Sequence, residues 1–149
     1  MKLAEALQER ADLNRQIEQL KFRLANNAIT QEGEAPAEDP GQLLERLDRS
    51  VARLEELMAA INLANCRTVV YGMTLTQLIA RKDCLRLKIE AYRELAEAAS
   101  QTAHRATRSE IRILSAVDVK AIQADVDAMA KELRLLDNKL QQTNWTTDL

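Results

Sequence analysis

The sequence predicts an all-α protein, an antiparallel up-down bundle of four long helices of the coiled-coil type. Three observations lead to this fold class. The 149 residues suit one domain, 46% of them are hydrophobic, and only three glycines, two prolines and 3% aromatic residues are present. Such a chain is rich in helix formers and poor in strand and turn formers. Apolar residues recur at alternating steps of three and four along four stretches, which is the spacing of one helix face.

The first two helices are predicted at about residues 2–27 and 41–65. The stripe of the first helix consists of Leu3, Ala6, Arg10, Leu13, Ile17, Leu20 and Leu24. The stripe of the second consists of Leu44, Leu47, Val51, Leu54, Met58, Ile61 and Asn65. The second helix follows Pro40, a residue that is common at the start of helices.

The third and fourth helices are predicted at about residues 74–104 and 116–142, followed by a tail at 143–149. The third stripe consists of Leu75, Leu78, Lys82, Leu85, Ile89, Tyr92, Ala96 and Ala99. The fourth consists of Val119, Ile122, Val126, Met129, Leu133, Leu136 and Leu140. Ser115 and Asp118 are placed to cap the amides of the fourth helix's first turn.

The connectors differ in charge, and two of them contain β-prone residues. The connector at 28–40 is acidic, and the connector at 105–115 is basic. The residues at 68–71 and 111–114 are β-branched or aromatic for the most part, although no partner strand is evident near either in sequence. We therefore expect at most two short β segments, both in connectors, and a single domain over 1–149.

Composition argues against several function classes. The net charge is −2, so nucleic acid or an anionic membrane is not an expected partner of the whole surface. No apolar run reaches the ~18 residues of a membrane span, and Glu5 and Glu9 stand where a signal peptide would be apolar, so we expect a cytoplasmic protein. With two cysteines and one histidine, we expect neither a structural disulfide nor a metal site. The sequence contains no glycine-rich phosphate loop and no nucleophile motif, so we expect no cofactor and no catalysis.

The sharpest polar cluster lies at the end of the third helix and in the basic connector. It consists of His104, Arg105, Arg108 and Arg112. Arginines at steps of three and four share one helix face and could bind an anion or nucleic acid. The alternative is structural, because the acidic connector is expected at the same end of the bundle and its carboxylates could neutralise the cluster. These carboxylates are Glu32, Glu34, Glu38 and Asp39.

Two further sets of residues interrupt the apolar pattern. Arg10 and Lys82 fall within apolar stripes, with Glu55 and Asp137 beside them, so the four could form a polar core layer that fixes register or binds a ligand. Apolar residues off the main stripes would face water in a monomeric bundle, and we expect them to make oligomer contacts. This set is Phe22, Leu57, Leu87, Leu95, Leu135 and Trp145.

Three segments resemble a small bacterial helical family that is sometimes labelled septicolysin. They are the residues 31–40, the run Arg108-Ser109-Glu110-Ile111 and the end Asn144-Trp145-Thr146-Thr147-Asp148-Leu149. The resemblance covers essentially the whole chain and implies a similar helical pattern. It brings no catalytic residues and no cofactor, and its label implies a cytolysin or pore former.

The sequence thus favours a homo-oligomeric helical bundle that serves as a structural or protein-interaction unit, with an unknown protein as a further possible partner. The alternative is a nucleic-acid or anion binder that uses Arg105, Arg108 and Arg112. A pore-forming activity rests on the family label alone.

Overall fold

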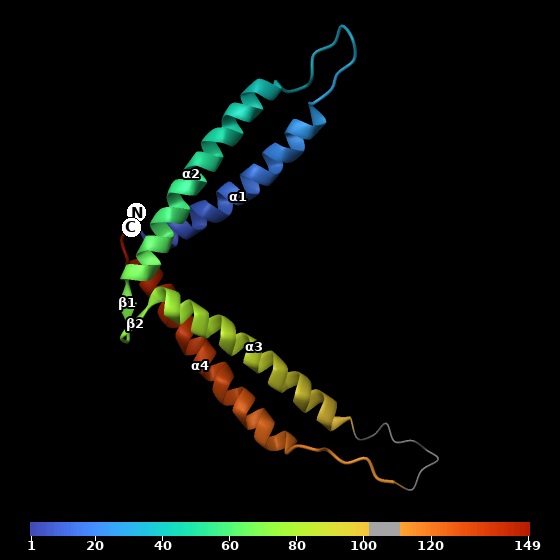
Figure 1. Cartoon of the computed structure of the whole chain (residues 1–149), viewed down its shortest axis with the longest axis vertical. Helices are drawn as coiled ribbons and strands as arrows, with labels where there is room; N and C mark the ends of the chain where they lie inside the picture. Colours follow the sequence, from blue (N-terminus) through green and yellow to red (C-terminus); the bar gives the residue numbers. More distant parts are fainter. Residues whose placement is uncertain (102–110) are drawn as a thin grey trace. The chain divides into compact units, whose positions relative to one another are not determined.

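A computed structural model of the chain confirms the predicted mostly-α fold with four helices (Figure 1). The structure describes residues 1–101 and 111–149. The elements in chain order are α1 (Leu3–Asn26), α2 (Pro40–Arg67), β1 (Val69–Val70), β2 (Met73–Thr74), α3 (Leu75–Ser100) and α4 (Val119–Thr146). Contacts divide the chain into two compact units, residues 1–74 with 143–149 and residues 75–142.

The first unit is built on the antiparallel hairpin of α1 and α2 (Figure 1). Three of the four buried residues of α1 belong to its predicted stripe, and two of them, Leu3 and Leu20, are fully buried. An ion pair borders this core: the Arg53 guanidinium of α2 donates two hydrogen bonds to the Glu9 carboxylate of α1, at 2.7 and 3.0 Å. These bonds lower the pKa of Glu9 below its ordinary value and raise that of Arg53. The pair therefore links the two helices in a defined register.

The acidic connector is anchored to the hairpin that it joins. The buried side chain of Asn27 donates to the Arg23 carbonyl at 2.8 Å and accepts from the Glu38 amide at 2.9 Å. Glu38 also pairs with the Arg23 guanidinium, which lowers the pKa of that carboxyl. Asp39 accepts a hydrogen bond from the Gly41 amide at 3.0 Å and caps α2, whose first residue is Pro40. Two of the four connector carboxylates thus have structural partners in the first unit.

The β-prone segment at 68–71 finds a partner that the sequence interpretation missed. Val69 pairs with Thr74 and Val70 with Met73, so β1 and β2 form a two-stranded antiparallel hairpin. Tyr71 and Gly72 make the turn with φ of 54° and 75°. Positive φ at both central residues is the mark of the tight turn whose twist suits a β-hairpin. The other β-prone segment, within its described residues 111–114, forms no strand.

The second unit contains α3 and most of α4, which run side by side (Figure 1). Their predicted stripes are confirmed, because every stripe residue from Leu75 to Ala99 and from Val119 to Leu140 is buried or half-buried. Two ion pairs join the helices, Arg81 with Glu132 and Lys82 with Asp137.

Three helix ends lie three or more residues from their predicted positions. α3 stops at Ser100, whose hydroxyl donates to the Ala96 carbonyl at 2.7 Å, rather than at 104. α4 begins at Val119 rather than 116, because Asp118 accepts a hydrogen bond from an amide of the first turn at 3.1 Å. Its helix continues to Thr146, so the first four residues of the predicted tail are helical.

The two ends of the chain lie together in the first unit (Figure 1). The Leu3 amide donates to the Thr147 carbonyl at 2.9 Å, and the Leu149 amide donates to the Met1 carbonyl at 3.0 Å. Lys2 forms a salt bridge with Asp148 at 2.8 Å, which lowers the pKa of Asp148. The end of α4 is thereby fixed to the start of α1.

Candidate functional site

One edge of α2 presents an apolar surface to solvent. Leu44, Val51 and Met58 recur every seven residues, and their exposed fractions are 49%, 45% and 48%. We call these three residues the α2 stripe. The sequence predicted that these three residues lie in the seam of the hairpin. In the structure, the residue that precedes each of them in the sequence is buried in the seam instead. The seam residues are Leu43, Ser50 and Leu57.

This shift of the α2 seam by one residue corrects the assignment of Leu57. Its side chain is only 2% exposed, within the core of the α1–α2 hairpin. Leu57 is therefore a core residue rather than an off-stripe residue available for oligomer contacts. The remaining predicted contact residues keep exposed side chains. They are Phe22, Leu87, Leu95, Leu135 and Trp145.

The second unit carries a groove between α3 and α4 with two hollows. The first has a volume of about 410 Å³ and the second about 380 Å³. The first is lined by Arg93, Ala96, Glu97, Ser100, Gln123, Val126 and Asp127. The second is lined by Arg86, Ile89, Glu90, Arg93, Glu94, Glu97 and Leu133. We call the two together the α3–α4 groove, a feature that the sequence interpretation did not anticipate.

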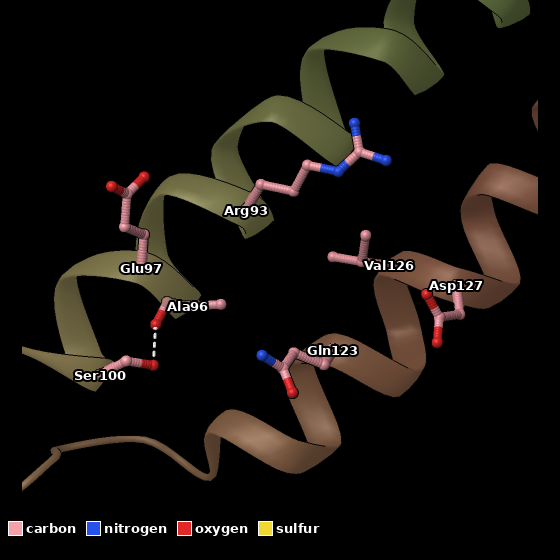
Figure 2. A pocket seen from close by; sticks show the side chains of 7 residues that line it. All are labelled: Arg93, Ala96, Glu97, Ser100, Gln123, Val126 and Asp127. Carbon is pink, nitrogen blue, oxygen red and sulfur yellow. Dashed lines mark hydrogen bonds between the residues drawn. The ribbon is translucent and has the colours of Figure 1, made fainter.

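Figure 2 shows the side chains of the first hollow. Arg93 extends from α3 toward the space between the helices, and Val126 points from α4 toward α3. Glu97 points away from α4, and the Ser100 hydroxyl is turned to the Ala96 carbonyl. Because Ala96 contributes only a methyl group to the seam, the space above Val126 stays unfilled. The hollow therefore combines apolar residues with the guanidinium of Arg93 and the carboxylates of Glu97 and Asp127.

Arg86 and Arg93 are the site residues that the sequence interpretation missed. Both are exposed, both line the groove, and they lie seven residues apart on α3. Their seven-residue spacing could have indicated a basic strip on α3, because residues seven apart share one helix face. The interpretation instead focused on the arginines of the basic connector.

The predicted basic cluster lies mostly beyond what the structure covers. His104, Arg105 and Arg108 fall outside the described residues. Arg112 is described, and its side chain is exposed in the extended segment that precedes α4. The anion-binding assignment therefore stays a prediction.

Two of the four residues predicted for the polar layer, Lys82 and Asp137, form an ion pair in the second unit. Lys82 is 17% exposed and bonds to Asp137, whose side chain is half-buried. Arg10 and Glu55 belong to the first unit, where Arg10 is half-buried and Glu55 is exposed. Within the described chain, neither Arg10 nor Glu55 forms a salt bridge.

The described part of the chain holds few other features of a functional site. Over residues 1–101 and 111–149, no three metal-binding side chains gather to hold an ion. Cys66 and Cys84 are exposed and form no disulfide. None of the helices in these residues is long and apolar enough to cross a membrane.

The chain resembles one solved structure closely. This structure is described as that of a functionally unknown conserved protein from Corynebacterium diphtheriae. The two share 37% sequence identity over 100% of this chain and 98% of the other, with a TM-score of 0.89. No curated protein matches the chain. A protein-family model described as a family of unknown function, DUF6847, matches residues 10–149. With the match covering nearly the whole chain, the protein belongs to this family of unknown function, DUF6847.

Proposed function

We propose that this protein is a homo-oligomeric helical unit whose role is to bind other proteins, a second copy of itself first among them. The α2 stripe carries the proposal. About half of the surface of its three side chains is exposed to water, although the neighbouring apolar residues of the same helix face are buried in the seam with α1. Apolar side chains repeated at heptad spacing along a helix are typical of helix-to-helix contacts.

Other features of the chain agree with a binding role. Phe22 and Leu87 are 69% and 66% exposed and so offer further apolar surface for contact with another protein. The charge of −2 is small, so mutual repulsion would not oppose association strongly. Exposed thiols at Cys66 and Cys84 suit a reducing compartment, and we place the protein in the cytoplasm. We treat it as a binding protein rather than an enzyme.

The native mass tests this proposal directly. We expect light scattering behind size-exclusion chromatography to give a multiple of 16.8 kDa that falls toward 16.8 kDa on dilution. Met58→Gln should weaken association, because it places an amide in the stripe. Leu63→Gln is the matched control, since Leu63 is also 48% exposed on α2 but lies off the stripe. A wild-type protein that stays at 16.8 kDa at high concentration would refute self-association.

The same chromatography can identify the alternative function. Excess absorbance at 260 nm in the protein peak would indicate bound nucleic acid and would favour the predicted role of Arg105, Arg108 and Arg112. That binding should weaken as salt rises, because phosphate contacts release counterions. The pore-forming activity implied by the resemblance would instead release dye from lipid vesicles.

A further inference from the structure

The two hollows of the α3–α4 groove repeat at the same interval as the α2 stripe. The floor of one is formed by Ile89 and Leu133, and that of the other by Ala96 and Val126. Both helices therefore advance by seven residues, about 10.5 Å, from one hollow to the next. Successive side chains of the α2 stripe are also seven residues apart. Knobs and hollows with one shared repeat are the geometry by which helices interlock.

Two acidic residues beside the α2 stripe and two arginines along the groove repeat at the same interval, and the groove is also lined by the carboxylates of Glu90, Glu94, Glu97 and Asp127. Asp48 and Glu55 are exposed on α2, four residues beyond Leu44 and Val51 respectively and so next to the stripe. Arg86 and Arg93 are exposed along the groove. Across the residues that the structure describes, none of these four charges is part of a salt bridge.

One antiparallel register satisfies both the charges and the shapes. When Asp48 is set opposite Arg93, the same alignment sets Glu55 opposite Arg86, because both pairs are seven residues apart. Val51 then falls at the level of Glu90, within the second hollow. By the same alignment, Leu44 falls at the level of Glu97, within the first hollow. This alignment therefore places two of the three stripe residues at the level of the hollows, while Met58 falls at the level of Asp83, beyond the second hollow.

We propose that the α2 stripe of one copy docks into the α3–α4 groove of a second copy, antiparallel to α3, with Asp48 opposite Arg93 and Glu55 opposite Arg86. The contact deepens the proposed self-association and rests on it. In the proposed dimer, each copy offers its stripe to the groove of the other, so that stripe and groove are each used twice. Apolar contact supplies most of the affinity, and the charges select the register and the partner.

Reversing the charges tests this contact. One variant carries Asp48→Arg and Glu55→Arg, and the other carries Arg86→Glu and Arg93→Glu. Each variant alone should be a monomer at concentrations where the wild type is dimeric, because like charges then face each other in both stripe-to-groove contacts of the dimer. An equimolar mixture should recover dimers, since the two reversed surfaces match each other and the two unchanged surfaces match as well. Native mass spectrometry identifies the mixed dimer by its mass.

Two controls separate this mechanism from unfolding and from a change in net charge. Lys131→Glu with Arg134→Glu changes the net charge as much as the reversal of Arg86 and Arg93, but on exposed α4 residues outside the groove, so it should leave the dimer intact. The helical circular dichroism of every variant should equal that of the wild type. A single chain with all four reversals should regain the dimer.

Each possible failure has its own meaning. If the wild type is an oligomer and both reversed variants remain oligomers, the docking contact is wrong while self-association stands. If the reversed variants lose the dimer but their mixture does not recover it, the charges do not face each other between copies, and the docking contact is again wrong. A wild-type monomer would overturn the proposed function and this contact together.

Discussion

Replacing Leu57 by alanine, with Met58→Ala as its control, distinguishes the two edges of α2. Leu57 is 2% exposed in the seam against α1, and the adjacent Met58 is 48% exposed in the α2 stripe. The two substitutions remove side chains of similar size from neighbouring positions of one helix. We therefore expect a large loss of stability from the first and a small one from the second.

The expected magnitudes follow from burial. Leu57→Ala removes three carbon atoms that are almost fully shielded from water, which costs roughly 2.4 kcal/mol at ~0.8 kcal/mol each. The cavity left behind adds to this, so the free energy of unfolding should fall by about 2.5–5 kcal/mol. Met58→Ala removes a side chain that is already half in water, and the same arithmetic gives about 1 kcal/mol or less. The high helix propensity of alanine reduces that loss further.

Urea unfolding followed by tryptophan fluorescence measures this difference. Trp145 is the only tryptophan, and it lies in the part of α4 that belongs to the first unit together with α1 and α2. The measurement is made on dilute protein, so that association does not add to the stability of either variant. Equal losses from the two variants, or a larger loss from Met58→Ala, would mean that the seam runs through Met58 and that the α2 stripe is not an outer edge.

Three other substitutions address the turn and the ion pairs. Gly72→Ala should lower the free energy of unfolding by about 1–2 kcal/mol, because Gly72 has a φ of 75° that strains residues with a Cβ atom. Urea unfolding followed by Trp145 fluorescence measures this loss, and an unchanged curve would show that the turn does not contribute to stability. Arg53→Gln should raise the pKa of Glu9 toward its ordinary value, since the two hydrogen bonds that lower it are lost. A carboxyl group whose pKa is lowered by folding stabilises the fold above its ordinary pKa of about 4.3, and this stabilisation is lost as the pH falls through the folded-state pKa. The stability difference between wild type and Arg53→Gln should therefore disappear in acid. An NMR titration of Glu9 checks the pKa shift, with Arg49→Gln, an exposed neighbour on α2, as the control. Asp137→Asn should destabilise the second unit more than Lys82→Met, because it leaves a largely buried ammonium group without its carboxylate, whereas a methionine needs no charged partner. Thermal unfolding followed by circular dichroism compares the two variants. A larger destabilisation from Lys82→Met would show that the Lys82 ammonium reaches water.

Most of the fold could be predicted from the sequence because three of the four helices carry one dominant apolar stripe. In α3 and α4, the predicted stripe residues are those that the structure buries. In α2, adjacent apolar pairs such as Leu43 with Leu44 and Leu57 with Met58 make the face wider than one seam. Periodicity alone cannot decide which edge of such a face meets α1. Val51 is more apolar than Ser50, yet the small Ser50 side chain is the one that fits in the seam.

The β-hairpin and the groove depend on features that periodicity does not reveal. The hairpin needs positive φ at Tyr71 as well as at Gly72, and a tyrosine gives no indication of that conformation in a sequence. The first hollow exists because Ala96 and Val126 together do not fill the seam where α3 and α4 face each other. The apolar character of Ala96 places it in the stripe, but its small size leaves space there. Local packing therefore decided these features.

The width of the apolar face on α2 is itself an argument about function. Two helices in a hairpin need only the narrow seam between them, and that seam is filled in the first unit by residues such as Leu43 and Leu57. A second row of apolar residues at heptad spacing adds nothing to that hairpin and costs solubility while it is exposed. It gains value only when another helical surface covers it. Asp48 and Glu55 beside this row favour a surface with positive charges at the same seven-residue interval, and Arg86 and Arg93 provide such charges among the carboxylates that also line the groove.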